Sequence, residues 1–347
     1  MMKKFLSFFL FSIILLIFFS GISFLLYLAV PSPLDENKII NIPKNSNLKE
    51  ITQLLEKERL ITGKKRFAFI VKILGKTNEL KAGEYLFPAY SLPVEILKKI
   101  LKGEELSYKF TIPEGYNTYQ ISMVLSQKGL VEKEKFIKFA CDTYLIKSLG
   151  IESESLEGYL FPDTYKFTKS LGEKKILKSM VKRFKKAFTP ELLKRAKELK
   201  LSLNQVVTLA SMIEREAYID SEKPLISAVF HNRLKLRMKL ESDPTVIYSI
   251  NAPPRRVYKK DLKKHTPTNT YLHPGIPPHP IANPGLKSIQ SALYPANVNY
   301  LFFVSLDGVT HKFSKSFQQH KRFIRKRYLN KLKLRKGNKK QKQVLSK

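Results

Sequence analysis

Apolar residues are unevenly distributed along the chain, and the longest apolar run lies at its start. Phe5–Val30 is a run of 26 residues without a charge, and it follows Lys3 and Lys4. Because about 20 apolar residues in a helix cross a bilayer, this run predicts a transmembrane helix. A cleaved signal peptide is the alternative, but its apolar core is typically about 7–15 residues long and no A-x-A site follows here. The positive-inside rule then puts residues 1–4 in the cytoplasm and the bulk of this single-pass chain outside the inner (cytoplasmic) membrane.

The next pattern of apolar and polar positions occurs twice. At an offset of 70 residues, Ile42-Pro43 matches Ile112-Pro113 and Asn47 matches Asn117. Each copy reads as a short strand, two helices and a closing strand with Gly-x-Tyr-Leu character, which in the second copy starts at Gly158. Repetition at such a period indicates small repeated modules, here over 40–105 and 110–165, although two amphipathic helices can also match by chance.

Residues 166–320 differ from the preceding segments in their pattern of apolar, polar and proline residues. Helical periodicity predicts helices within 174–201, over 203–217 and over 223–236, and the second is apolar nearly all round, which indicates burial. Ten prolines between 243 and 295 argue against a regular helix or a central strand there. The alternating residues around Asp307-Gly308 predict a hairpin from Tyr300–Ser305 and Thr310–Phe313. The fold class is therefore α+β, with a transmembrane helix, small modules and a mixed α+β domain.

Composition narrows the possible functions. The 347 residues include 63 Lys and Arg against 29 Asp and Glu, a formal net charge of +34, and 13 of these cations lie in a basic tail over 321–347. Repulsion predicts poor order in that tail beyond about Asn330. Such charge attracts any polyanion, but no nucleic-acid recognition motif accompanies it, so we expect anionic lipids or wall polymers rather than nucleic acid as partners. The single cysteine, Cys141, and six scattered histidines predict no disulfide and no metal site.

Two acids at the end of the predicted buried helix are the strongest catalytic candidates. Glu214 and Glu216 stand in the run Leu209-Ala-Ser-Met-Ile-Glu-Arg-Glu-Ala217. A carboxyl group at the edge of apolar packing has a raised pKa, as a general acid near neutral pH requires. Two exposed acids paired with Arg215 or Lys223 are the alternative, and helix phase alone does not choose between the two glutamates.

Several motifs together resemble the endolytic murein transglycosylase family, the YceG-like proteins formerly described as aminodeoxychorismate lyases. They follow the family order and reach to about His320. The matching runs are Ile112-Pro-Glu-Gly115, Glu157-Gly-Tyr-Leu-Phe-Pro-Asp-Thr-Tyr165, Leu209-Ala-Ser-Met-Ile-Glu-Arg-Glu216, Val229-Phe-His-Asn-Arg-Leu234, Ser242-Asp-Pro-Thr-Val-Ile-Tyr248, Asn269-Thr-Tyr271, Gly275-Ile-Pro-Pro278 and Ile281-Ala-Asn-Pro-Gly285.

The resemblance implies a LysM-like module over 40–105, a second related module over 110–165 and a catalytic domain over 166–320. It also implies that Glu216 is the catalytic acid and base that cleaves the bond between N-acetylmuramic acid and N-acetylglucosamine in nascent peptidoglycan strands. The products then carry 1,6-anhydro ends, no cofactor or metal is required, and peptidoglycan synthases are the expected partners. The implied substrate-binding residues are Asn232, Arg233, Asp243, Thr245, Asn269 and Tyr271.

Alternatives remain open at this level. Asp243 and Arg233 could form a structural ion pair instead of binding substrate, while Tyr159, Phe161 and Tyr165 are expected in the core rather than on a sugar. Thr268 and His279 depart from the family pattern beside the expected cleft. A membrane-anchored wall-binding protein without catalysis is the main rival function. A pyridoxal-phosphate lyase is disfavoured because no phosphate-binding frame with a Schiff-base lysine is visible.

Overall fold

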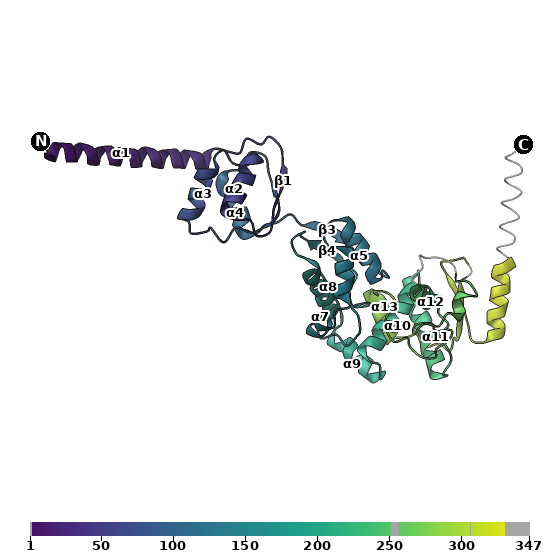
Figure 1. The fold of residues 1–347 in the computed structure, drawn as a ribbon. Helices are drawn as coiled ribbons and strands as arrows, with labels where there is room; N and C mark the ends of the chain where they lie inside the picture. The colour runs from purple at the N-terminus through teal and green to yellow at the C-terminus, as the bar shows by residue number, and fades with distance from the viewer. Residues whose placement is uncertain (1, 251–256, 306, 330–347) are drawn as a thin grey trace, which may run out of the picture. The chain divides into compact units, whose positions relative to one another are not determined.

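The chain folds into two compact units. The computed structural model describes residues 2–250, 257–305 and 307–329 (Figure 1). Unit 1 consists of Met1–Lys109 with Lys166–Gly172, and unit 2 of Phe110–Tyr165 with Glu173–Lys347. Both units combine helices with short two-stranded sheets, so the predicted α+β class is confirmed.

Unit 1 places three helices beside one β-ladder. Strands β1 and β2 are antiparallel, and their register pairs Lys38 with Phe87 and Ile42 with Gly83. Alternate residues of β2 are buried, as expected of a strand with one face on a core. The elements are α1 (Met2–Ala29), β1 (Lys38–Ile42), α2 (Leu48–Lys57), α3 (Lys64–Ile73), β2 (Gly83–Phe87) and α4 (Pro93–Lys102).

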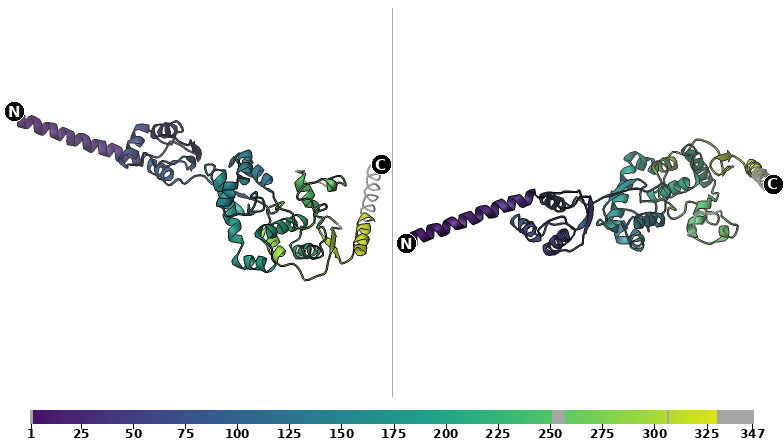
Figure 2. Two further views of the ribbon diagram at one scale, coloured as in Figure 1. Left: turned by 60° about the horizontal axis from the view of Figure 1, so that its bottom comes forward. Right: turned by 90° about the horizontal axis from the view of Figure 1, so that it is seen from above.

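Helix α1 leaves the rest of unit 1 as a long single helix (Figures 1 and 2). Phe8–Ala29 is long and apolar enough to cross a membrane, and none of its most apolar 18-residue window is buried. Its C-terminal end is different, because Tyr27 is only 3% exposed and belongs to the apolar core of α2, α3 and α4. The Tyr27 hydroxyl reaches the carbonyl oxygen of Gly63 at 3.4 Å, and the rings of Phe24 and Phe69 meet edge to face.

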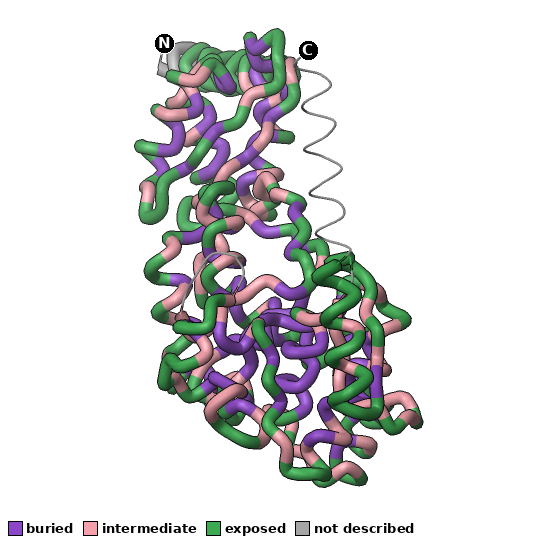
Figure 3. The backbone as a smooth tube through the Cα atoms, turned by 90° about the vertical axis from the view of Figure 1, so that its right-hand side faces the viewer, coloured by how far each residue is buried: buried purple, intermediate pink, exposed green. Residues whose placement is uncertain are grey.

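Unit 2 is mostly helical. Helix α10 lies within it, packed against α9, α11, α12 and α13, and buried residues gather in the interior of the unit (Figure 3). Strands β3 (Tyr108–Thr111) and β4 (Thr164–Phe167) each have residues in both units. The other elements are α5 (Thr118–Gln127), α6 (Lys133–Ala140), α7 (Thr143–Ser148), α8 (Glu173–Ala187), α9 (Pro190–Glu198), α10 (Leu203–Glu216), η1 (Asp220–Glu222), α11 (Lys223–Lys235), α12 (Asp243–Ser249), η2 (Asp261–Lys263), α13 (Leu286–Leu293), β5 (Phe302–Ser305) and β6 (His311–Ser314).

The two predicted modules begin alike. Asn47 and Asn117 each cap a ten-residue helix, and each forms a capping box with the residue three positions on, Glu50 or Gln120. The sheets β1–β2 and β3–β4 close the two segments. The matched asparagines therefore have the same capping role in both segments.

The predicted strand at Gly158 is wrong, because residues 157–160 form turns and a bend and β4 starts only at Thr164. Gly158 has a φ of +88°, and a Cβ there would lie 2.5 Å from Pro280 and 2.8 Å from Val207. The tight turn thus brings the backbone against α10 and the proline-rich loop, which only glycine allows. Tyr159, Phe161 and Tyr165 are buried, as predicted.

The helices predicted within 174–201, 203–217 and 223–236 are confirmed, as is the hairpin, now β5 and β6. The exclusion of helices from 243–295 is wrong, since α12 and α13 lie there. Pro244 stands in the first turn of α12, where proline is tolerated, and α13 lies between Pro284 and Pro295 without containing a proline. Residues 317–329 are helical. The disorder predicted beyond Asn330 falls outside the described residues.

Candidate functional site

Helix α10 presents the candidate acids at its C-terminal end. Ser202 and Gln205 form a capping box at its start, and every residue from Val206 to Ile213 is buried. The helix ends at Glu216, and Ala217 continues in an extended conformation. Because one apolar helix supports both acids, Glu214 and Glu216 are held rigidly on two different sides of it.

Glu216 lies half-buried beside the start of α12. The Ser242 hydroxyl donates a hydrogen bond of 2.6 Å to Oε1 of Glu216. Burial raises the pKa of Glu216 to about 7, with a contribution from the Asp243 charge, while the Ser242 hydrogen bond and the nearby Arg215 and Arg233 act in the opposite direction. A carboxyl group with this pKa exists in both protonation states near neutral pH, so Glu216 can donate and accept a proton.

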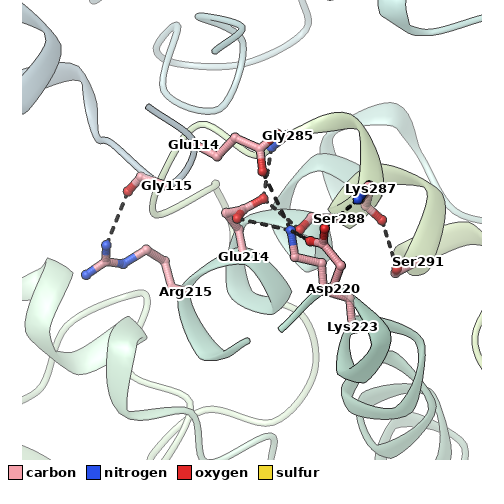
Figure 4. A network of polar contacts seen from close by, with 10 residues as sticks. All are labelled: Glu114, Gly115, Glu214, Arg215, Asp220, Lys223, Gly285, Lys287, Ser288 and Ser291. Atoms are coloured by element: carbon pink, nitrogen blue, oxygen red, sulfur yellow. Dashed lines mark hydrogen bonds and ion pairs between the residues drawn. The ribbon is translucent and has the colours of Figure 1, made fainter. Parts of the chain in front are cut away.

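Glu214 instead belongs to a network of charged and polar groups (Figure 4). Its Oε1 lies 3.3 Å from Lys223 Nζ, and its Oε2 accepts hydrogen bonds from the backbone N–H of Gly285 at 3.0 Å and from the Ser288 hydroxyl at 2.7 Å. Every oxygen of this carboxylate therefore has a partner from α11 or from the start of α13. The Glu214 carboxylate thus connects α10 to α11 and α13 and does not face an open site.

Asp243 and Tyr271 lie on the solvent side of the Glu216 region. The Tyr271 hydroxyl donates a 2.7 Å hydrogen bond to Oδ1 of Asp243, which is exposed in the first turn of α12. Burial, and then the Asp243 charge, raises the pKa of Tyr271, so its hydroxyl keeps its proton. These two residues and Glu216 form the accessible polar part of the site.

The other four predicted substrate-binding residues have their polar groups engaged inside the protein. Asn232 donates to the carbonyls of Val298 and Tyr300. Asn269 donates to the carbonyls of Leu262 and Lys264.

The remaining two of these residues, Arg233 and Thr245, have hydrogen-bond partners on neighbouring segments. Arg233 bonds to the Leu301 carbonyl and lies 3.1 Å from a carboxylate oxygen of Glu241. The ion pair considered between Arg233 and Asp243 is therefore replaced by one with Glu241. Thr245 donates to the Ser242 carbonyl at 2.6 Å, and its Oγ1 lies 2.9 Å from the Thr270 hydroxyl, so it joins α12 to the loop that contains Thr270.

Three residues near the site were not predicted from sequence. Ser242 holds Glu216, and Thr270 in turn accepts the backbone N–H of Ser242 at 2.9 Å. Glu157, only 4% exposed, receives the N–H of Thr118 at 3.1 Å on both oxygens. Ser242 and Glu157 stand in the motifs that carry the family resemblance, and this is the only sequence signal that could have singled them out.

A pocket of about 460 Å³ opens beside Glu157. Thr268 and His279, the two departures from the family pattern, both contribute to its wall. The full lining is Asn117, Thr118, Tyr119, Ile137, Ala140, Cys141, Ser155, Glu157, Tyr248, Ser249, Thr266, Pro267, Thr268 and His279. Within the part of the chain that the structure describes, no three His, Cys, Asp or Glu side chains gather as they would around a metal ion.

Comparisons with known proteins give a consistent result. The model of the YceG-like family matches residues 40–326. A Bacillus subtilis (strain 168) protein named endolytic murein transglycosylase is 32% identical over 297 residues, which cover 81% of this chain and 82% of the relative. A Streptococcus pneumoniae serotype 2 protein of the same name is 29% identical, and the match covers 82% of this chain but 60% of the relative. The crystal structure of a YceG-like protein from Listeria monocytogenes is 32% identical with a TM-score of 0.58, covering 83% of this chain and 98% of that one.

Proposed function

The chain belongs to the YceG-like family, and from this premise we propose that it is a membrane-anchored peptidoglycan lytic transglycosylase. The observation that carries the proposal is Glu216, an acid with a pKa of about 7 at the end of a rigid buried helix. It stands at the second Glu of the family's Ser-x-x-Glu-Arg-Glu run. We propose that the enzyme acts within nascent glycan strands and so terminates their elongation.

The proposed chemistry needs one carboxyl group and no water. Protonated Glu216 gives its proton to the oxygen that links N-acetylmuramic acid C1 to N-acetylglucosamine, and the C1–O bond breaks. The 6-hydroxyl of the same muramic acid then forms a bond to C1 and gives its proton to the Glu216 carboxylate. This regenerates the acid and leaves a 1,6-anhydro end. Hydrolytic glycosidases, by contrast, generally use two carboxyl groups around the bond.

The surrounding residues divide into two proposed roles. Asp243 and Tyr271 are accessible beside Glu216, and we propose that they contact the sugar. Asn232, Arg233, Thr245 and Asn269 act on substrate only indirectly, because their polar groups bond within the protein, to residues 239–242, 262–264 and 298–301. This revises the sequence prediction that all six touch substrate.

Digestion of purified sacculi tests the proposed function. The full chain in detergent should release muropeptides with 1,6-anhydro-N-acetylmuramic acid ends, identified by mass spectrometry. The rival is a wall-binding protein without catalysis, which would bind sacculi and release nothing. Binding without new anhydro ends would contradict the proposal.

The pH dependence of cleavage should report on Glu216. Since the acid must start protonated, we expect kcat/KM to fall as the pH rises through about 7. Ser242→Ala removes a hydrogen bond that favours the carboxylate, so it should move this fall to higher pH. Asp243→Asn removes a charge that disfavours the carboxylate and should move it to lower pH. Shifts in the same direction for both variants would contradict the assignment of Glu216 as the titrating acid.

We propose that α1 is a retained anchor rather than a cleaved signal. Tyr27 and Phe24 pack into the module that follows, so cleavage after the apolar run would remove part of that module's core. We also propose that residues 40–105 are a LysM-like module that binds glycan, as the resemblance implies, and that peptidoglycan synthases are partners. The cations of the chain, 63 Lys and Arg, suit an anionic membrane surface or wall polymer.

The topology has a direct test. A reporter that is active only in the cytoplasm, fused after Ser32, should give no signal in cells that express it, because Lys3 and Lys4 hold the N-terminus inside. The same reporter fused before Phe5 is the control and should be active. Activity after Ser32 would show that the chain does not cross the membrane in the proposed direction.

A further inference from the structure

The pocket beside Glu157 does not include the Glu216 carboxyl group, but helix α12 contributes residues to both places. Ser242 and Asp243, at the start of α12, face Glu216, while Tyr248 and Ser249, at its end, line the pocket. A helix rises about 1.5 Å per residue, so six residues separate the two places by about 9 Å along α12. A linear polymer bound at Glu216 would therefore reach the pocket by extending along α12.

The pocket offers a hydrogen-bonding group that the protein does not use. Thr266 lines the pocket, and among the described residues its buried Oγ1 has no hydrogen-bond partner. Because leaving a buried hydroxyl without a partner is destabilising, this group on the pocket wall indicates a ligand that supplies the missing bond.

Glu157 is the acid of this pocket, and its position is firmly set. It accepts bonds from the Thr118 N–H and from the side-chain amide of Asn283 at 3.0 Å, and the Tyr248 hydroxyl lies 3.4 Å away. Burial raises the pKa of Glu157 to about 7, against the hydrogen bonds from Thr118, Tyr248 and Gly158. A substantial neutral fraction near pH 7 makes it a hydrogen-bonding group rather than a fixed charge.

The residues that line the pocket also disfavour one class of ligand. None of the 14 described residues that line it is Lys or Arg, although the chain contains 63 of these residues. Among these described lining residues an anionic group such as a phosphate or a peptide carboxylate would meet no cation, and it would lie close to Glu157. The wall instead combines hydroxyl groups with the rings of Tyr119, Tyr248 and His279, and the last two meet edge to face at 5.8 Å. Hydroxyls beside aromatic rings suit a neutral sugar, which has polar edges and apolar faces.

We propose that this pocket, the Glu157 pocket, is a subsite for a neutral N-acetylated sugar of the glycan strand, with Thr266 and Glu157 hydrogen-bonding to it. The proposal rests on the proposed function for the identity of the strand. It favours N-acetylglucosamine over N-acetylmuramic acid, because the lactyl group and peptide of the latter bring carboxylates. The subsite would set where along a strand the bond is presented to Glu216.

Cys141 provides the measurement. It is exposed, lines the pocket and is the only cysteine of the chain, so a thiol reagent labels one site. The full-length protein in detergent is alkylated with N-ethylmaleimide over a range of chitotetraose concentrations, and the labelling rate is followed by mass spectrometry. We expect chitotetraose to slow labelling in a saturable way. Cys141→Ser with Lys194→Cys, which moves the thiol to an exposed site on α9, should be labelled at a rate that chitotetraose does not change.

Two matched substitutions separate ligand binding from folding. Thr266→Val removes only the unpartnered hydroxyl, so it should leave the fold intact and raise the chitotetraose concentration for half protection by about 2–12-fold, the value of one neutral hydrogen bond. Thr208→Val removes another unpartnered buried hydroxyl, on α10 and outside the pocket, and should change nothing. Equal shifts for both variants, or no protection of the wild type, would overturn the proposal.

The test is independent of the proposed reaction. Glu216→Gln should retain the same protection by chitotetraose, because Glu216 is not part of the pocket lining. Protection together with intact sacculi would refute the transglycosylase function and leave the subsite standing. Cleavage of sacculi without any protection of Cys141 would refute the subsite and leave the function standing.

Discussion

Glu216→Gln is expected to slow glycan cleavage by at least about 10²-fold, and by as much as about 10⁴-fold, with the fold intact. Gln is nearly isosteric with Glu but can neither give up nor take the proton that both steps of the proposed reaction require. Its side-chain oxygen can still accept the Ser242 hydrogen bond that positions Glu216. Initial rates of anhydro-end formation from sacculi measure the loss, and circular dichroism checks the fold.

Glu214→Gln is the matched control, since it makes the same change two residues away. The Glu214 carboxylate is engaged by Lys223, Gly285 and Ser288, so the variant should lose stability while the intact fraction retains cleavage. If Glu214→Gln were inactive and Glu216→Gln nearly normal, the assignment of the acid would be wrong. If both were active, the chemistry would lie elsewhere, and Asp243 and Glu241 would be tested next.

Lys223→Met should destabilise the α10–α13 packing by about 3 kcal/mol or more. Lys223 is only 3% exposed, and its Nζ lies 3.1 Å from Asp220, 3.3 Å from Glu214 and 3.6 Å from Glu114 (Figure 4). Burial disfavours its charge, but these carboxylates outweigh that effect and keep the pKa of Lys223 above its ordinary value. Removing the cation leaves Glu214 as an uncompensated buried charge, and breaking a buried pair in this way costs about 3–5 kcal/mol.

Lys287→Met is the control for this prediction. Lys287 also pairs with Asp220, at 2.5 Å, but its side chain is 65% exposed, so its loss should cost less than about 1 kcal/mol. Deuterium exchange of the α10 amides in the full-length chain measures both effects, because it reports on local opening in the native protein. Lys223→Met should speed that exchange by about 10²-fold or more. Similar exchange in the two variants would show that the network does not stabilise α10.

Local patterns predicted much of the fold. The uncharged run, the buried α10 and the β5–β6 hairpin are all properties of residues close in sequence. The failures have physical causes too. The residues around Gly158 predicted a strand. Close contacts with Pro280 and Val207, which are distant in sequence, require a tight turn there instead.

Sequence-based prediction of the candidate site was limited in the same way. The residues of the site stand in recognisable motifs, but a motif does not say which side chains face the substrate. Asn232 and Asn269 are bonded to carbonyls 66 and 7 residues away, and only the fold reveals this. In the same way, helix phase did not choose between Glu214 and Glu216, whereas their partners on α11, α12 and α13 distinguish them.

The central claim, that the wall bond is broken without water, can be tested by digesting sacculi in water enriched in ¹⁸O. Intramolecular attack by the 6-hydroxyl predicts new anhydro ends that contain no ¹⁸O, and these ends should be absent with Glu216→Gln. A hydrolase would add one water per bond and place ¹⁸O at C1 of each new reducing end. Finding that label in the wild-type products would contradict the account.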